Sequence, residues 1–327
     1  MTIQLAEQPL DPPVFLAPMA GITDLPFRQL VLRFGAGLVV SEMVASQEVV
    51  QAKPGTRERA ELGLAQSQTS VQLAGRDTYW IAEAARFVAD QGAKIIDINM
   101  GCPAKKVVGG LSGSALMRDP CQALRLIEAV IAAVDVPVTL KMRLGWDDNS
   151  LNAPMIARQA EESGVAMITV HGRTRCQFYK GQADWAAIAP VVEAVTIPVI
   201  ANGDITSTHS ARQALAQSGA AGVMIGRGAQ GRPWILAQIA HELYGQPAPQ
   251  IPQNSALVAM VQDHHAQMIE FYGDYLGLRV ARKHLGWYMD QANTAADLRR
   301  MVLTEDCPSR LYRLLPDALL AEEVQAA

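Results

Sequence analysis

The stretch that decides the fold is IIDINMGCP, residues 95–103. A short apolar run ends there in the polar residue Asn99, after which a glycine and a proline turn the chain away. A run of this kind, bounded by turn-forming residues, is typical of a buried β-strand. Helical stretches separate it from similar runs before and after it, so the pattern predicts one strand of a parallel sheet.

The same unit recurs eight times between Val14 and Arg227. The runs are almost wholly apolar, which indicates that helices cover both faces of the sheet. Eight strand–helix units over about 230 residues match the size of a TIM barrel, a closed (β/α)8 barrel, and a doubly wound open sheet is the alternative. The eight runs are residues 14–17, 38–41, 69–73, 95–98, 138–140, 167–170, 199–201 and 223–225.

The pattern changes towards the C-terminus. Residues 246–253, QPAPQIPQ, are rich in proline and glutamine and predict a linker. From residue 254 onward the apolar residues recur at helical spacing, and this stretch is too short for a second barrel. We therefore expect an α/β TIM-barrel domain over residues 1–245 and a small all-α helical bundle over residues 254–327.

Composition excludes several classes of protein. Half of the residues are apolar and 18% are charged, which is the balance of a folded, soluble chain. The N-terminus lacks the basic start and apolar run of a signal peptide, and charges interrupt the most apolar stretch, so we expect a cytoplasmic protein without a membrane span. The four cysteines form no close pair, and we expect no metal site. They are Cys102, Cys121, Cys176 and Cys307.

The net charge of −4 argues against indiscriminate nucleic-acid binding, but it leaves room for a local basic face. Arg279, Arg282 and Lys283 are three and four residues apart and share one face of a predicted helix. Arg173 and Arg175 belong to a second basic cluster, close to the predicted strand ends. Each cluster alone is ordinary for a solvated surface, but together they predict a path for a polyanionic substrate.

The ends of the predicted strands carry polar or turn-forming residues. In a TIM barrel the catalytic residues gather at this C-terminal rim. A single polar residue at a strand end marks an exit to solvent, but a whole ring of them indicates a functional site. The ring consists of Pro18, Met19, Ala20, Glu42, Gln72, Asn99, Lys141, His171, Asn202, Gly226 and Arg227.

Two rim loops predict a phosphate pocket. Residues 226–231, GRGAQG, match the dinucleotide fingerprint, but they follow the last strand and no acidic residue stands about 20 positions further on, so we reject a Rossmann site. The loops after the last two strands of a TIM barrel commonly bind phosphate, because their glycines let backbone N–H groups approach the anion. The residues in those two loops are Asn202, Gly203, Asp204, Gly226 and Arg227.

Three further rim residues carry reactive groups. Lys141 suits a Schiff-base nucleophile, a positive charge beside an anionic cofactor, or a structural ion pair. His171 suits a general acid, a hydrogen-bond donor to a ring carbonyl, or a packed polar residue. Cys102 heads a glycine-rich run, and an ordinary thiol, mostly protonated at neutral pH, is better suited to donate a proton than to attack a substrate. An inert, half-buried cysteine is the alternative.

These motifs resemble those of the tRNA-dihydrouridine synthases, in particular the bacterial B-type subfamily, and the resemblance covers nearly the whole chain. The segment around Cys102 is the most diagnostic. The matching segments are APMAGITDLPFR (17–28), SEM (41–43), VQLAG (71–75), DINMGCPAKKV (97–107), LKMRLGW (140–146), VHGRTR (170–175), IANGDI (200–205) and MIGRGAQGRPW (224–234).

The resemblance implies an FMN-binding barrel followed by a helical tRNA-binding domain, with NADPH or NADH as reductant, and no protein partner is predicted. It implies hydride transfer to C6 of uracil and protonation of C5 by Cys102. Asn99 would line the pocket for the extruded base, and tRNA would contact Arg173, Arg175 and the basic helix face. The residues expected to bind FMN are Pro18, Met19, Ala20, Gln72, Lys141, His171, Asn202, Gly203, Asp204, Gly226 and Arg227.

Two other functions remain open. A small-molecule pyrimidine reductase of the dihydroorotate dehydrogenase type would share the flavin-binding barrel, but it has little use for a basic C-terminal helix. A non-catalytic RNA-binding regulator on the same fold would not need the intact set of Cys102, Lys141, His171 and Arg227.

Overall fold

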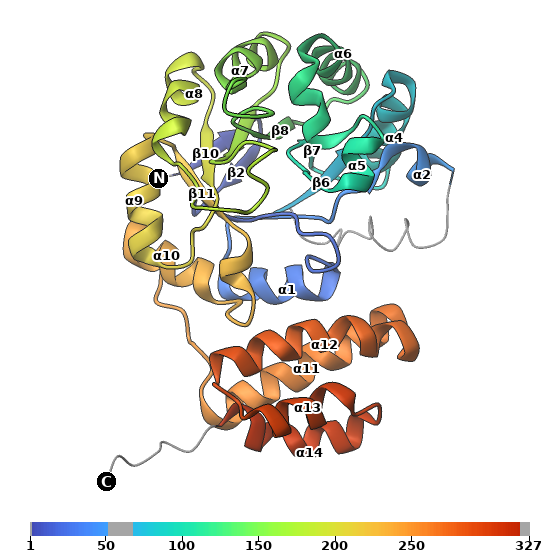
Figure 1. Ribbon diagram of the computed structural model, residues 1–327, viewed down its shortest axis with the longest axis vertical. Coiled ribbons are helices and arrows are strands. Elements are labelled where there is room, and N and C mark those ends of the chain that lie inside the picture. Colours follow the sequence, from blue (N-terminus) through green and yellow to red (C-terminus); the bar gives the residue numbers. More distant parts are fainter. Residues whose placement is uncertain (1, 52–67, 321–327) are drawn as a thin grey trace.

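The computed structural model describes residues 2–51 and 68–320, and it shows eight parallel strands closed into a barrel (Figure 1). The last strand, β11, pairs with the first, β3, so that Ile225 lies opposite Leu16. The predicted TIM barrel is therefore confirmed, and the open sheet is excluded. The strands are β3 (Val14–Leu16), β4 (Leu38–Val40), β6 (Thr69–Ala74), β7 (Ile95–Met100), β8 (Val138–Arg143), β9 (Met167–His171), β10 (Val199–Asn202) and β11 (Gly222–Ile225).

Helices alternate with the strands and cover the outside of the barrel (Figure 1). In the first of them, the carboxylate of Asp24 accepts a hydrogen bond from the N–H of Phe27 at 3.0 Å and caps the helix. Gly35 ends this helix in the left-handed conformation, with φ 109°. The helices are α1 (Leu25–Phe34), α2 (Ser46–Val50), α4 (Thr78–Asp90), α5 (Lys105–Gly109), α6 (Pro120–Ile131), α7 (Ala153–Glu162), α8 (Ala189–Ala194), α9 (Thr208–Ser218) and α10 (Ile235–Tyr244).

A short hairpin that the sequence analysis did not predict precedes the barrel. Its antiparallel strands are β1 (Ile3–Leu5) and β2 (Gln8–Leu10). Ile3, Leu5 and Leu10 are buried in one cluster with barrel residues such as Phe15 and Ile200. Apolar side chains therefore fill the end of the barrel at which the strands begin. A second unpredicted element, the two-residue strand β5 (Val44–Ala45), pairs with β6.

Four helices follow the barrel within the described residues, and the first two of them lie next to α1 (Figure 1). They enclose a separate apolar core that includes Val261, Leu285, Leu311 and Leu315. Residues 246–253 contain no helix or strand, and the division into two domains stays a prediction. Residues 321–327 of the predicted bundle lie outside the described residues. The helices are α11 (Asn254–Tyr272), α12 (Asp274–Gln291), α13 (Ala296–Thr304) and α14 (Pro308–Leu319). None of the helices in the described part of the chain is long and apolar enough to cross a membrane.

Aromatic and histidine rings join the barrel to these helices. Phe27 of α1 lies 5.8 Å from the ring of His264 in α11 and 5.0 Å from the ring of His284 in α12. Both histidines are buried, and burial lowers the pKa of His264 to about 3 and that of His284 well below its usual value. Neither ring nitrogen of His284 has a hydrogen-bond partner among the described residues. The packing therefore requires neutral imidazoles.

We expect this interface to make the protein sensitive to acid. A histidine with a lowered pKa gives its full stabilisation above pH 6.5, its value in the unfolded chain, and loses it as the pH falls towards the folded value. The loss is about 2 kcal/mol by about pH 5 for each buried histidine. Asp24 offsets part of this loss, because burial raises its pKa to about 6 and protonation then favours the folded state.

Urea unfolding at a series of pH values tests this expectation. The His284→Leu variant should lose about 2 kcal/mol of the pH dependence of the unfolding free energy, because it removes one titrating group. The His209→Gln variant, at an exposed position on α9, should keep the wild-type dependence. Equal pH slopes for wild type and His284→Leu would contradict the assignment.

Candidate active site at the C-terminal rim of the barrel

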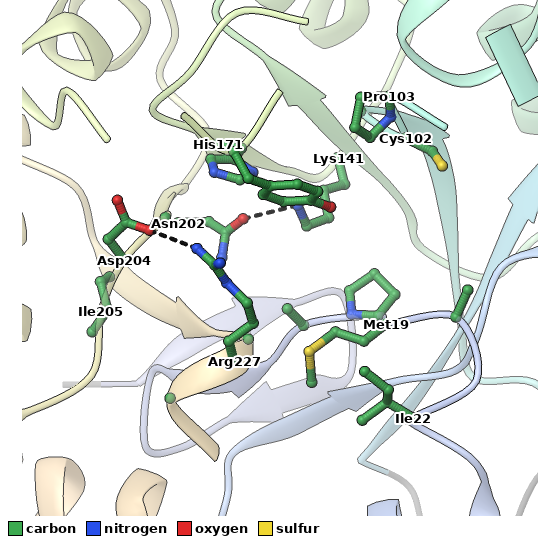
Figure 2. A pocket seen from close by; sticks show the side chains of 18 of the residues that line it. Met19, Ile22, Cys102, Pro103, Lys141, His171, Asn202, Asp204, Ile205 and Arg227 are labelled. Atoms are coloured by element: carbon green, nitrogen blue, oxygen red, sulfur yellow. Dashed lines mark hydrogen bonds and ion pairs between the residues drawn. The ribbon is translucent and has the colours of Figure 1, made fainter. Parts of the chain in front are cut away.

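A cavity of about 840 Å³ opens where the barrel strands end. The catalytic, cofactor-binding and base-pocket residues predicted from the sequence all line it (Figure 2). Figure 2 shows Cys102 on one side of the cavity and Asp204 with Arg227 on the other, with Lys141 and His171 between them. The predicted residues that the structure brings together are Pro18, Met19, Ala20, Gln72, Asn99, Cys102, Lys141, His171, Asn202, Gly203, Asp204, Gly226 and Arg227.

The backbone around Cys102 is held by its neighbours. The side-chain oxygen of Asn99 accepts hydrogen bonds from the N–H groups of Gly101 at 3.2 Å and Cys102 at 3.0 Å. The carbonyl of Cys102 accepts two hydrogen bonds from Ser114, one from its N–H at 3.1 Å and one from its hydroxyl at 2.8 Å. The glycine-rich run after Cys102 folds into α5 and a 3-10 helix, Gly113–Arg118. The backbone that carries the half-buried thiol is therefore fixed at the cavity wall.

A chain of buried hydrogen bonds supports Asn99. The amide nitrogen of Asn99 donates to the side-chain oxygen of Gln72 at 2.7 Å, and the amide nitrogen of Gln72 donates to Asp97 at 2.6 Å. The second carboxylate oxygen of Asp97 accepts from the hydroxyl of Thr139 at 2.7 Å. Burial raises the pKa of Asp97, while the hydrogen bonds from Gln72 and Thr139 favour its charged form. The sequence analysis missed Asp97 and Thr139, although a lone carboxylate within an apolar strand signals a buried polar network.

Lys141 lies at the centre of the rim. Its ammonium group donates to the side-chain oxygen of Asn202 at 2.9 Å, and the amide nitrogen of Asn202 donates to the carbonyl of Met224 at 2.8 Å. Burial, together with the positive charge of Arg143, lowers the pKa of Lys141 to about 8. The amine is therefore still mostly protonated at neutral pH. Of the three predicted roles, this favours a positive charge beside an anionic group.

His171 is neutral at neutral pH. Burial lowers its pKa well below the usual value, and the positive charges of Lys141, Arg143 and Arg173 lower it further. A guanidinium nitrogen of Arg173 lies 3.3 Å from Nε2 of His171. Because a guanidinium group only donates, Nε2 acts as the acceptor and Nδ1 carries the proton. His171 is therefore suited to hydrogen bonding and not to acting as a general acid at neutral pH.

Two arginines share the carboxylate of Asp204. Arg173 donates at 3.0 Å, Arg227 at 3.0 Å and the N–H of Ala183 at 2.9 Å. Burial acts to raise the pKa of Asp204, but the hydrogen bonds and charges of the arginines lower it overall. Gly203 precedes Asp204 with φ 118°, and a Cβ atom there would lie 2.7 Å from that of Ala183, so this turn requires glycine. Asp204 thus holds Arg227, which is 58% exposed, at the edge of the cavity.

Arg173 and Arg143, two basic residues near the rim, are fully buried at 1% exposure. Arg173 donates to the carbonyls of Lys180 and Gly181 as well as to Asp204, so the predicted contact with tRNA does not agree with its position. Arg143 joins two rim loops: it donates to the carbonyl of Gly101 at 2.8 Å on one side, and to Thr174 and Phe178, each at 2.9 Å, on the other. Both arginines therefore connect the loops around the site.

The other predicted RNA-binding residues lie away from the cavity. The guanidinium carbon of Arg175 lies 4.8 Å from the ring centre of Trp146. Arg279 is exposed and donates to the hydroxyl of Tyr275 at 2.9 Å, whereas Arg282 pairs with Asp306 at 2.6 Å. The ammonium group of Lys283 donates to the carbonyl of Gly21 in the barrel at 2.6 Å. The three basic residues of α12 thus do not form one free face.

The sequence matches the family model described as dihydrouridine synthase (Dus) over residues 15–317. The chain belongs to the dihydrouridine synthase family. This dihydrouridine synthase family member is 62% identical to a probable tRNA-dihydrouridine synthase of Rhodobacter capsulatus, over 99% of each chain. It is 48% identical to tRNA-dihydrouridine synthase B of Xanthomonas axonopodis pv. citri, over 98% of this chain and 97% of that relative. The resemblance inferred from the motifs is confirmed.

Two solved structures share the fold at low sequence identity. Histamine dehydrogenase from Rhizobium sp. 4-9 superposes with a TM-score of 0.57 at 12% identity, over 81% of this chain and 50% of that structure. A 2-naphthoyl-CoA reductase superposes with a TM-score of 0.58 at 12% identity, over 75% of this chain and 52% of that structure. The chain spans about half the length of each, and the likeness concerns the barrel fold alone.

We expect Arg143→Met to destabilise this family member by about 3 kcal/mol, because it leaves three carbonyl groups without their charged donor. The loops that carry Cys102 and Phe178 should then separate, since Arg143 bonds to both. Urea unfolding measures the change. The Arg212→Met variant, at an exposed position on α9, is the control and should unfold like the wild type. A loss below about 1 kcal/mol for Arg143→Met would show that the loops hold without it.

Proposed function

We propose that this protein is an FMN-dependent tRNA-dihydrouridine synthase, which reduces the C5–C6 double bond of uridines in tRNA with hydride from NADPH or NADH. The observation that carries the proposal is that one cavity of about 840 Å³ is lined by the thiol of Cys102, by the buried ammonium group of Lys141 and by the two loops predicted to bind phosphate. We call the part of the cavity beside these two loops, at Gly203, Gly226 and Arg227, the phosphate corner. Its volume falls within the usual range for cofactor sites. Membership of the family favours this reaction over a small-molecule reductase or a regulator.

The residues present fit the phosphate end of FMN. Gly203 and Gly226 leave the backbone open to an anion, and a Cβ atom on Gly226 would meet only Met19 and Ala17, at 3.6 and 3.7 Å. Asp204 orients Arg227 towards this corner. Arg227, the backbone of both loops and Asn202 would hold the phosphate, while the carboxylate of Asp204 would act only through the arginine.

The middle of the cavity fits a flavin ring. Lys141 places a positive charge there, and His171 supplies a neutral ring, so the two would hydrogen-bond the pyrimidine end of the flavin. Pro18, Met19 and Ala20 would form an apolar wall, with Gln72 beside them. When bound, reduced FMN supplies the hydride for C6 of the uracil ring.

Cys102 would complete the reduction by protonating C5. Its backbone is fixed by Asn99 and Ser114, so the thiol holds a proton at one defined place on the cavity wall. The thiol would give up that proton as negative charge develops on the substrate. Addition of one hydride and one proton converts the double bond to a single bond, and the resulting thiolate regains its proton from water. The uridine must leave its stack to reach this wall.

We expect the purified protein to be yellow and to form dihydrouridine in an unmodified tRNA transcript supplied with NADPH, as measured by mass spectrometry of the digested RNA. Cys102→Ala should keep the flavin spectrum and reduce product formation at least 100-fold, within the usual range of about 10²–10⁴-fold for a general acid. Cys121→Ala, at an exposed cysteine on α6, should retain wild-type turnover.

The outcomes of this experiment separate the rival functions. Unchanged turnover in Cys102→Ala would remove Cys102 from the mechanism. A yellow protein that oxidises NADPH but leaves every uridine intact would favour a small-molecule reductase. A colourless protein that binds tRNA would favour a non-catalytic regulator.

Arg175 and Arg118 form a second surface that fits tRNA. Their guanidinium carbons lie 4.8 and 3.9 Å from the ring centre of Trp146. Stacking restrains both side chains, and Arg118 is exposed while Arg175 is half-buried. A restrained guanidinium group of this kind suits phosphate recognition. The residues come from three neighbouring rim loops, those after β7, β8 and β9. We therefore propose that the RNA backbone crosses this Arg118–Trp146–Arg175 stack.

The double variant Arg118→Ala with Arg175→Ala should bind tRNA about tenfold more weakly. Its slope of log affinity against log salt concentration should fall by about 2, because each arginine neutralises about one phosphate. Filter binding at several salt concentrations measures both quantities. The matched control is Arg158→Ala, an exposed arginine on α7, for which both should match the wild type. An unchanged salt slope in the double variant would refute the contact.

A further inference from the structure

Helix α12 touches the cavity wall near the middle of its length, at Lys283. Residues 17–24 connect β3 to α1, and several of them line the cavity. Gly21 in this segment is held from two sides. Its N–H donates to the carboxylate of Glu42 at 2.6 Å, and its carbonyl accepts from the ammonium group of Lys283 in α12 at 2.6 Å. The barrel and the helix thus hold the same residue, through the two peptide groups on either side of its Cα atom.

The segment around Gly21 is a compact turn. The carbonyl of Met19 accepts from the N–H groups of Ile22 and Thr23, each at 3.0 Å, and the hydroxyl of Thr23 accepts from the N–H of Met19 at 2.9 Å. Gly21 has φ 71°, a conformation that suits glycine. Because the turn is closed by its own hydrogen bonds, a force on the carbonyl of Gly21 is passed on to Met19, which lines the cavity.

The C-terminal half of α12 reaches the cavity at the opposite loop. Gly231 follows Gly226 and Arg227 in the loop after β11 and packs directly on α12. A Cβ atom on Gly231 would lie 2.4 Å from the carbonyl oxygen of Trp287. One turn later Gln291, the last residue of α12, lines the cavity together with Arg232. The same helix therefore contacts the loop after β3 and the loop after β11.

We infer that α12 forms a wall of the cofactor cavity, and that Lys283 is a positioning residue that sets the turn against the flavin through Gly21. The inference rests on the proposed function, because it concerns FMN. It gives Lys283 a different role from the predicted contact with RNA. An ammonium-to-carbonyl hydrogen bond of this length is charge-assisted, which makes it stronger than a neutral one. Without the hydrogen bond from Lys283, the turn at Gly21 is held less firmly against the flavin ring.

The same helix provides a matched control. Arg279 lies one turn before Lys283, is exposed, and rests on Tyr275, with its guanidinium carbon 5.5 Å from the ring centre. It therefore carries the same charge on the same helix without touching the barrel turn. If the helix acted on FMN only through its positive charge, neutralising either residue would weaken FMN binding. If Lys283 positions the turn, only the substitution of Lys283 would weaken it.

The test is the affinity of the full-length apoprotein for FMN, measured by quenching of flavin fluorescence. We expect Lys283→Met to weaken FMN binding about tenfold, in line with the loss of one charged hydrogen bond. Lys283→Arg should recover most of the affinity, because it can still donate to the carbonyl of Gly21. Arg279→Met should bind FMN like the wild type. The visible circular dichroism of bound flavin should change in Lys283→Met, since the ring then meets a displaced wall.

Wild-type FMN affinity in a folded Lys283→Met variant would overturn the inference, whatever happens to tRNA binding. Far-UV circular dichroism establishes whether the variant folds. If Lys283→Met does not fold, FMN binding is measured for Gln291→Ala, at the C-terminal end of α12. We expect this variant to bind FMN about threefold more weakly, and unchanged binding would overturn the inference. A wild-type apoprotein that takes up no FMN would instead overturn the proposed function.

Discussion

Closure of the barrel is the constraint on which the rest of the structure depends. The hydrogen bonds between β11 and β3 leave the ring without a free edge, and parallel strands in a ring must all end on the same side. Residues far apart in the sequence, such as Pro18 and Arg227, therefore meet around one cavity. The hairpin before β3 fills the other end of the barrel with apolar side chains.

Buried charge at the rim is stabilised by hydrogen bonds between loops. Arg143 ties the loop after β7 to the loop after β9, and Arg173 ties the loop after β9 to Asp204 after β10. Burying unpaired charges in this way would be costly, but carbonyl groups and one carboxylate satisfy them. Burial, together with the accumulated positive charge, lowers the pKa of His171 and keeps it neutral, and the same charge favours an anion near Lys141.

The sequence predicted the barrel and the cavity-lining residues because both follow from local patterns. Apolar runs indicate strands, and the fold then places every strand end at one rim. The hairpin of β1 and β2 was missed, since its strands, IQL and QPL, contain polar residues and a proline and do not form apolar runs. Arg173 and Lys283 were interpreted as surface cations for RNA, but a sequence does not reveal which carbonyl a long side chain reaches. Asp97 was missed because its partners, Gln72 and Thr139, come from other strands.

The tight contact between Gly231 and Trp287 limits how this architecture can be recombined. The barrel and the C-terminal helices meet there without room for a single methyl group. A chimaera that joined this barrel to the helices of a distant relative would need a matching backbone path at that point. Each part has an apolar core of its own, but neither can be exchanged without a matching surface at this contact.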